Sequence, residues 1–169
     1  MLNNVQSLGS GSHSLGGLSQ LSYPGTFYIV YQGYNDRDVM TGIREGYYRA
    51  LPSVDRSLAW VEGGGRGKRV RVGFVSSYFR RHSVCKLFCG MITGLDREKF
   101  EPVVFAHVQK RDEVTEEVRE SVGEDNWVDV GERGFLLSNS GVVGEMKVDV
   151  LVYLDIGMDN GSSMWAFSR

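Results

Sequence analysis

Two arginines and a histidine stand where an apolar, strand-like run of the sequence gives way to an amphipathic, helix-like one. Arg80, Arg81 and His82 occupy this junction, and Ser83 follows as a candidate cap for the helix. A helix start offers free N–H groups and partial positive charge, so added cations would suit a phosphate, a carboxylate or a polar substrate edge. The imidazole of His82 could also transfer a proton. The alternative is that both arginines are solvated and His82 merely fills a turn.

A second polar cluster follows a later apolar run, in the stretch DIGMDNGSS. Asp155 would be the last residue of that strand, where a buried carboxylate is costly unless it is satisfied by partners. It either closes an Asx-turn or faces a site. The loop is kept polar by Asp159, Asn160, Ser162 and Ser163.

The spacing of the remaining polar residues does not support a metal site or a phosphate loop. His82, Cys85 and Cys89 fall on one face of the predicted helix, but they match no common zinc pattern. The stretch EGGGRGKR departs from the phosphate-loop pattern at Glu62 and Arg69. The sequence contains no G-x-S-x-G, H-E-x-x-H or C-x-x-C motif, and no G-x-G-x-x-G follows the first strand.

Three further residues with reactive side chains are interpreted as structural. Cys85 and Cys89 are expected to be small, reduced core residues in a reducing compartment, since two cysteines imply no disulfide framework. His107 closes an apolar strand run and is expected to serve packing.

The elements that must position these residues alternate between strand-like and helix-like patterns. Short apolar runs rich in β-branched residues predict strands, and amphipathic stretches between them predict helices. The predicted strands are 70–77, 100–108, 126–130 and 148–155, and the predicted helices are 83–95, 111–123 and 135–146. This order indicates an α/β fold with a Rossmann-like parallel sheet buried on both faces. Ligands of such sheets bind at the carboxyl ends of the strands, where both polar clusters stand.

Composition divides the chain into four segments. We expect a disordered Ser/Gly-rich tail, a helical linker segment, a Gly-rich basic linker and a Rossmann-like lobe. Their ranges are 1–22, 23–52, 53–69 and 70–169. Aromatic and aliphatic residues at helical spacing in the second segment predict a helical hairpin that buries them, with Asn35 and Asp36 capping its second helix.

Charge and hydropathy exclude several classes of partner. The 169 residues are 41% hydrophobic and 24% charged, with a net charge of -2, so no polyanion such as nucleic acid is indicated. No apolar stretch is long enough to span a membrane, and the N-terminus lacks the basic and apolar regions of a secretion signal. We therefore expect a soluble protein of the cytoplasm, the nucleus or both, without a membrane partner.

Two segments resemble a known family. VRVGFVSSYFRRHSVCKLFCGMITGLDREKFEPVVFA is similar to the start of the catalytic region of the O-linked N-acetylglucosamine transferase family, which includes the SPINDLY-type transferases. The family's motif R-V-G-[FY]-[VLI]-S-x-x-[FL]-x-x-H places its histidine on His82. Its L-D-x-x-x-F-E-V motif matches Leu95, Asp96, Phe100 and Glu101. DVLVYLDIGMDNGSS resembles the family's fourth-strand segment.

The resemblance implies the first lobe of a two-lobed GT-B glycosyltransferase. Such an enzyme transfers N-acetylglucosamine from UDP-N-acetylglucosamine to Ser or Thr of proteins, with inversion and without a metal or other cofactor. His82 would be catalytic. The residues expected to line the acceptor cleft are Ser77, Tyr78, Arg81, Asp155, Gly157 and Asp159. Tyr78 departs from the family, because many members have Asp at that position.

The resemblance also implies that a second lobe would supply most of the pocket for the sugar donor. In the family a second lobe holds most of the donor pocket, and this lobe is not recognisable here, so the isolated chain is expected to be inactive. Two alternatives stay open. One is a non-catalytic binding or scaffold protein that keeps the lobe without the chemistry, and the other is an O-fucosyltransferase of the SPINDLY type.

Overall fold

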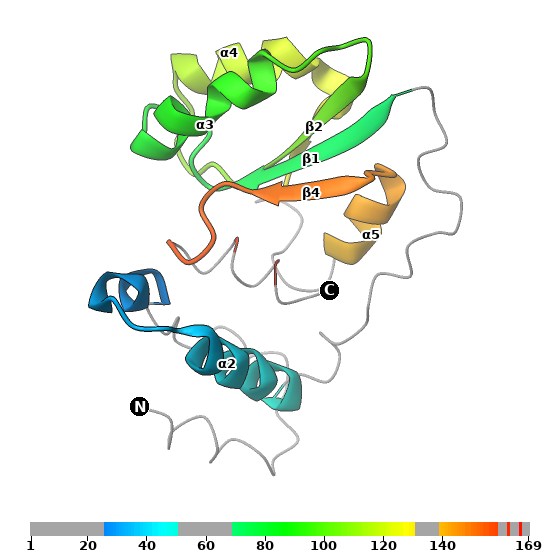
Figure 1. Cartoon of the computed structure of the whole chain (residues 1–169). Helices are drawn as coiled ribbons and strands as arrows, with labels where there is room; N and C mark the ends of the chain where they lie inside the picture. Colours follow the sequence, from blue (N-terminus) through cyan, green and yellow to red (C-terminus); the bar gives the residue numbers. More distant parts are fainter. Residues whose placement is uncertain (1–25, 51–68, 131–138, 159–161, 163–165, 167–169) are drawn as a thin grey trace.

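The computed structural model describes residues 26–50, 69–130, 139–158, 162 and 166 (Figure 1). Within these ranges the chain forms a parallel sheet with helices, preceded by a separate helical segment. The elements in chain order are η2 (Thr26–Gln32), α2 (Arg37–Ala50), β1 (Val70–Ser76), α3 (Ser83–Thr93), β2 (Phe100–Ala106), α4 (Glu113–Val122), η3 (Glu124–Asn126), β3 (Trp127–Asp129), α5 (Asn139–Glu145) and β4 (Val150–Tyr153). The predicted alternation of strands and helices is confirmed, with ends that differ by a few residues.

The four strands form one parallel sheet in the order β3-β2-β1-β4. From β1 the chain winds through α3, β2, α4 and β3 to one side of the sheet. It then returns to place β4 on the other side of β1. The strand order therefore reverses between β1 and β4, which is the topological switch point where ligands of such sheets bind.

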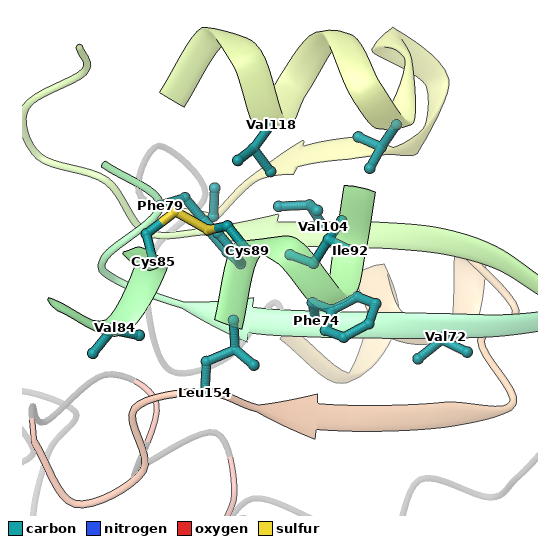
Figure 2. Packing of buried hydrophobic residues seen from close by; sticks show 12 residues of the cluster. Val72, Phe74, Phe79, Val84, Cys85, Cys89, Ile92, Val104, Val118 and Leu154 are labelled. Carbon is teal, nitrogen blue, oxygen red and sulfur yellow. A yellow bond between two sulfur atoms is a disulfide. The ribbon is translucent and has the colours of Figure 1, made fainter. Parts of the chain in front are cut away.

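The apolar runs of the strands bury side chains on both faces of the sheet, because successive residues point to opposite sides. Val72 and Phe74 of β1 face α3 and α4, whereas Val75 faces α5 (Figures 1 and 2). The α5 side contains Val75, Val103, Phe105, Val130, Val142, Val143 and Val148. Two apolar clusters thus hold one sheet between two layers of helices, as the sequence predicted.

The helical segment before the sheet differs from the predicted hairpin. Its first arm is the short 3-10 helix η2, and Tyr28, Val30, Tyr31 and Tyr34 are 69%, 63%, 69% and 84% exposed. The prediction that this segment buries its aromatic residues is therefore wrong. The physical reason is that η2 is a single short element whose Phe27 ring packs edge-on against neighbouring tyrosines of η2 itself.

The cap of the second helix in this segment follows the prediction. The Oδ1 atom of Asn35 accepts a hydrogen bond of 3.1 Å from the backbone N–H of Arg37, at the start of α2. The predicted tail at 1–22 and nearly all of the linker at 53–69 lie outside the described residues. None of the described helices is both long and apolar enough to cross a bilayer.

The two cysteines lie in the core as predicted, but they are not reduced. Cys85 and Cys89 form a disulfide within α3, with Cα atoms 4.7 Å apart (Figure 2). The two residues share one face of α3, and their Cα separation lies within the range usual for disulfides. Both residues are buried in the cluster between the sheet and the α3–α4 layer. The expectation of free thiols is therefore corrected.

Substitution of Gly73 tests the fit of the sheet against α5. A Cβ atom at this position would lie 2.7 Å from Cδ2 of Leu151 and 2.9 Å from Cε2 of Phe105. We expect Gly73→Ala to lower the free energy of unfolding by about 1–3 kcal/mol, measured by urea denaturation. The matched control is Gly90→Ala in α3, where nothing lies within 4 Å of the new atom. It should be neutral or raise stability by up to about 1 kcal/mol. Equal effects of the two substitutions would contradict this account.

Candidate functional site

The sheet brings the two polar clusters of the sequence side by side. Val75 of β1 is the parallel partner of Tyr153 of β4, and the N–H of Leu154 donates to the carbonyl of Val75 at 3.1 Å. The segments that follow the two strands therefore leave the sheet from adjacent positions at its carboxyl edge. On the other side of β1, the N–H of His107 donates to the carbonyl of Ser76 at 3.1 Å. Three strand ends thus meet at the switch point.

Asp155 is the buried centre of this edge. Its side chain is nearly inaccessible, with 2% of the residue exposed, and its Oδ2 atom accepts from the hydroxyl of Ser76 at 3.0 Å and from the N–H of Ser77 at 2.9 Å. Its Oδ1 atom accepts from the hydroxyl of Ser162. A buried carboxylate is stable only with such donors. We predicted that Asp155 lines the cleft, whereas the structure places it inside the protein, where it shapes both segments.

The segment after β4 turns sharply directly after Asp155. The N–H of Met158 donates to the carbonyl of Asp155 at 2.9 Å, which closes a four-residue turn. Gly157, the third residue of this turn, has a φ of 88°, a conformation that L side chains rarely adopt. Gly157 is buried beside Asp155, so its role is to let the chain turn at the edge.

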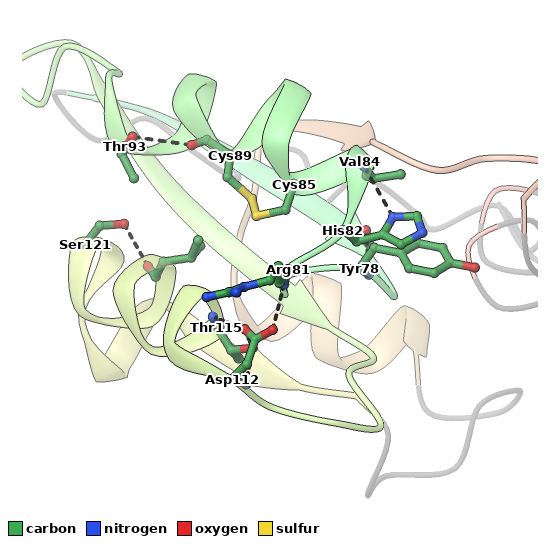
Figure 3. Close-up of a disulfide and its surroundings, with 12 residues drawn as sticks. Tyr78, Arg81, His82, Val84, Cys85, Cys89, Thr93, Asp112, Thr115 and Ser121 are labelled. Carbon is green, nitrogen blue, oxygen red and sulfur yellow. Dashed lines mark hydrogen bonds between the residues drawn. A yellow bond between two sulfur atoms is a disulfide. The ribbon is translucent and has the colours of Figure 1, made fainter.

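His82, and not Ser83, caps helix α3. Its backbone is extended, with φ -147° and ψ 157°, and its Nδ1 atom accepts a hydrogen bond of 3.2 Å from the N–H of Val84 (Figure 3). The imidazole takes the place that a serine hydroxyl was expected to fill, because Val84 N–H lies within reach of a side chain at the N-cap. Since Nδ1 accepts, the proton of the neutral ring is on Nε2, which is then a donor.

Aromatic stacking also orients His82. The rings of Tyr78 and His82 are stacked, with centroids 4.1 Å apart and planes 19° from parallel (Figure 3). The N–H of Tyr78 donates to the hydroxyl of Ser76 at 2.9 Å, and that hydroxyl in turn donates to Asp155. The orientation of the imidazole is therefore linked, through Tyr78 and Ser76, to the buried carboxylate.

The two arginines of the junction point to different partners. The backbone N–H of Arg81 donates to Oδ2 of Asp112 at 2.7 Å, and its guanidinium pairs with Glu113 at the start of α4. Its side chain is 77% exposed, so Arg81 joins the junction to α4 and does not reach the strand ends. The guanidinium of Arg80 lies 5.5 Å from the centre of the Tyr78 ring, where a cation–π contact can form.

His107 lies at the site although it was interpreted as structural. Its Nδ1 atom is 3.4 Å from the hydroxyl oxygen of Ser77, a long hydrogen bond whose donor depends on the tautomer. The sequence held a signal for this placement: His107 directly follows β2, and β2 was predicted next to β1 in chain order. His107, at the end of β2, is therefore a neighbour of Ser77, and His82 lies further along the segment that follows β1.

The structure thus brings together most of the residues that the sequence singled out. Ser77, Tyr78, His82, Asp155 and Gly157 gather at the carboxyl edge of β1 and β4. Arg81 is turned to α4, and Asp159 lies outside the described residues. Among the described residues, no three His, Cys, Asp or Glu side chains are grouped as metal ligands would be. The arrangement can donate and accept hydrogen bonds to a hydroxyl-bearing ligand.

Comparison with known proteins identifies a solved structure with a similar fold. The chain is similar to the solved structure of a lysine-to-methionine variant of the O-GlcNAc transferase of Thermobaculum terrenum, with a TM-score of 0.58 and 22% identity. The match covers 80% of this chain and 26% of that chain, so this chain spans about a quarter of that enzyme. No family model matches the sequence, and no curated protein matches it. The fold is therefore that of a Rossmann-like lobe of a GT-B glycosyltransferase.

Removing the Asp155 carboxylate tests its role at the edge. Asp155→Ala leaves the hydroxyls of Ser76 and Ser162 and the N–H of Ser77 without their buried acceptor. We expect the free energy of unfolding to fall by about 3 kcal/mol in chemical denaturation. The control is Asp125→Ala, which removes an exposed carboxylate and should change stability by less than about 0.5 kcal/mol. If Asp155→Ala lowered the free energy of unfolding by as little as the control, the hydrogen bonds to this carboxylate would not be needed for stability.

A pH titration tests the contact between Asp112 and the junction. The N–H of Arg81 donates to Asp112 and lowers the pKa of that carboxyl below its ordinary value of 3.8, with help from Thr115. The carboxylate therefore adds stability above that value, and the contribution is lost as pH falls through the lower pKa of the folded state. We expect Asp112→Asn to be less stable than the parent protein at pH 6, and the gap to narrow between pH 4 and pH 2. A gap of constant size would contradict the assignment.

Proposed function

We propose that this chain is the acceptor-side lobe of a protein O-glycosyltransferase that moves N-acetylglucosamine from UDP-N-acetylglucosamine to Ser or Thr hydroxyls. The observation that carries the proposal is the position of His82. Its imidazole is fixed at the switch point by the N–H of Val84 and the ring of Tyr78, in a lobe whose fold is that of GT-B transferases. The family resemblance of the surrounding motif supports the same assignment.

In this reaction the acceptor hydroxyl attacks the anomeric carbon while the bond to the diphosphate breaks. The nucleoside diphosphate leaves and takes up the proton that the hydroxyl loses. With Nδ1 committed to Val84, neutral His82 offers an Nε2–H donor and so can orient an acceptor oxygen. Neutral His82 could accept a proton only at Nδ1. It would then lose the hydrogen bond from the N–H of Val84, which caps α3. His82 therefore acts foremost in positioning, and we assign no metal or other cofactor.

His107 and Ser77 complete the acceptor side of this proposal. They stand on the β1 and β2 ends, 3.4 Å apart, and their side chains are partly exposed. A serine or threonine hydroxyl needs one donor and one acceptor to be held in one orientation. The two imidazoles and the Ser77 hydroxyl supply both kinds of group. Most of the donor pocket is assigned to a second lobe, since this chain spans about a quarter of the similar enzyme.

Two alternatives keep the same lobe. In a binding or scaffold protein the Tyr78–His82 stack would recognise a ligand without chemistry; the stack itself favours this reading, since it covers a face of the imidazole. In an O-fucosyltransferase the donor would be GDP-fucose, and no feature of the described residues separates it from the first proposal. The choice among the three rests on the ligands that the protein binds and modifies.

Calorimetry with nucleotide sugars and acceptor peptides tests the assignment. We expect the chain to bind a Ser/Thr peptide more tightly than its Ala-substituted match. It should bind UDP-N-acetylglucosamine, GDP-fucose and UDP weakly or not at all. Micromolar binding of a nucleotide sugar would overturn the assignment of the donor pocket to another lobe. Equal affinity for the Ser/Thr and Ala peptides would overturn the acceptor role.

Two substitutions separate the cap of α3 from the function of His82. His82→Ala removes both the cap and the imidazole, and should cost about 1 kcal/mol of stability. His82→Asn keeps a good capping side chain, so stability should stay within about 0.5 kcal/mol of the parent protein. Both variants should weaken binding of the Ser/Thr peptide by about three- to tenfold. If His82→Asn bound the peptide as the parent does, His82 would be a structural cap only.

A further inference from the structure

A cavity of about 700 Å³ lies between α3 and α4 and reaches the junction between β1 and α3. Its lining includes Arg80, Arg81 and His82 of the junction and runs along α3 from Ser83 to Thr93 and along α4 from Val114 to Val118. Asp155, at the centre of the candidate site, does not contribute to it. We call this space the α3–α4 cavity. It is large enough for a small organic ligand. It shares His82 with the candidate site, but its α4 wall and Lys86 take no part in the proposed transfer reaction.

The inner wall of the α3–α4 cavity is apolar. It consists of the Cys85–Cys89 disulfide together with Val114 and Val118. Figure 3 shows the disulfide on the side of α3 that faces α4. The two cysteines are 4% and 8% exposed and Val118 is 2% exposed, so the wall belongs to the packed core. Such a surface favours an aromatic or aliphatic group of a ligand.

The rim of the cavity carries more positive than negative charge. Arg80, Arg81 and Lys86 line it against a single acid, Glu117. Arg81 is neutralised by its pair with Glu113. No carboxylate in the described part of the chain forms an ion pair with Arg80 or Lys86. Two cations thus remain at one end of the cavity, close to the start of α3, where the helix adds partial positive charge.

A glycine keeps the cavity open. Gly90 lies in the middle of α3 and lines the cavity, and a Cβ atom built on it would meet nothing within 4 Å. A glycine inside a helix costs about 1 kcal/mol relative to alanine. Neither close packing nor an unusual backbone angle requires it here. A methyl group would fit here, whereas a large side chain at this position would fill part of the cavity.

We propose that the α3–α4 cavity binds a small phosphate monoester that carries an apolar group. The phosphate lies between Arg80 and Lys86, and the apolar group packs on the disulfide, Val114 and Val118. A doubly charged phosphate matches two cations that have no acidic partner in the part of the chain that the structure describes, and a point charge such as Lys86 suits a phosphate oxygen. The apolar wall would add affinity that inorganic phosphate alone cannot obtain.

Titration of the full chain with phenyl phosphate, followed by amide chemical shifts in NMR spectra, tests the proposal. We expect saturable shifts in α3 and α4, with an affinity at least about tenfold above that of inorganic phosphate or phenol. If inorganic phosphate bound as tightly as phenyl phosphate, the charges alone would account for binding and the apolar wall would have no role. If phenol bound as tightly as phenyl phosphate, Arg80 and Lys86 would not contribute to binding. Shifts confined to the strand ends around Ser77, His107 and Asp155, with none in α4, would place the ligand elsewhere. Each of these three results overturns the proposal.

Variants locate the ligand within the cavity. Lys86→Ala should weaken phenyl phosphate about three- to fivefold, while the control Lys110→Ala, an exposed lysine outside the cavity, should have no effect. Gly90→Phe should fill the cavity and weaken binding by about tenfold or more, whereas Gly90→Ala should leave most of the affinity. Circular dichroism confirms that each variant is folded. Unchanged affinity in both Lys86→Ala and Gly90→Phe would show that the α3–α4 cavity is not the site.

Discussion

The buried carboxylate of Asp155 holds together the two chain segments from which the candidate site is built. It accepts hydrogen bonds from the end of β1, through Ser76 and Ser77, and from Ser162 beyond β4. A charged group in this position would be destabilising alone, so each donor must be in place for the edge to exist. The polar residues at the switch point are thus parts of one network, and a change in any of them alters the shape of the whole edge.

The β1–α3 junction is held at both of its ends. Asp155 fixes its beginning through Ser77, and Asp112 of the α4 cap fixes its end through the N–H of Arg81. Between these points His82 uses one nitrogen to cap α3, which leaves the other for a ligand. The same side chain therefore caps the helix and, in the proposed function, also recognises the acceptor. This proposed dual use would explain why a histidine stands where the sequence pattern would accept a serine as cap.

Helix α3 separates two surfaces of different character. On the side of the strand ends lie imidazoles, hydroxyls and the stacked Tyr78, which suit a hydroxyl-bearing acceptor. On the side of α4 lie an apolar wall and two cations, Arg80 and Lys86, which form no ion pair within the described residues and suit an organic anion. Both surfaces begin at the residues between β1 and α3.

Local pattern was enough to predict the elements of this protein, and tertiary structure decided which of their residues meet. Apolar periodicity and β-branched runs depend on neighbouring residues, so the strands, the helices and the parallel α/β class followed from the sequence. Asp155 is 79 residues from its hydrogen-bond partner Ser76, and His107 is 30 residues from Ser77, so no local sequence pattern could predict these pairs. The exposure of Tyr28 and Tyr31 and the turn of Arg81 toward Glu113 also depended on which neighbours were within reach. Hydrogen bonds and packing act over a few ångströms in space, whatever the separation along the chain.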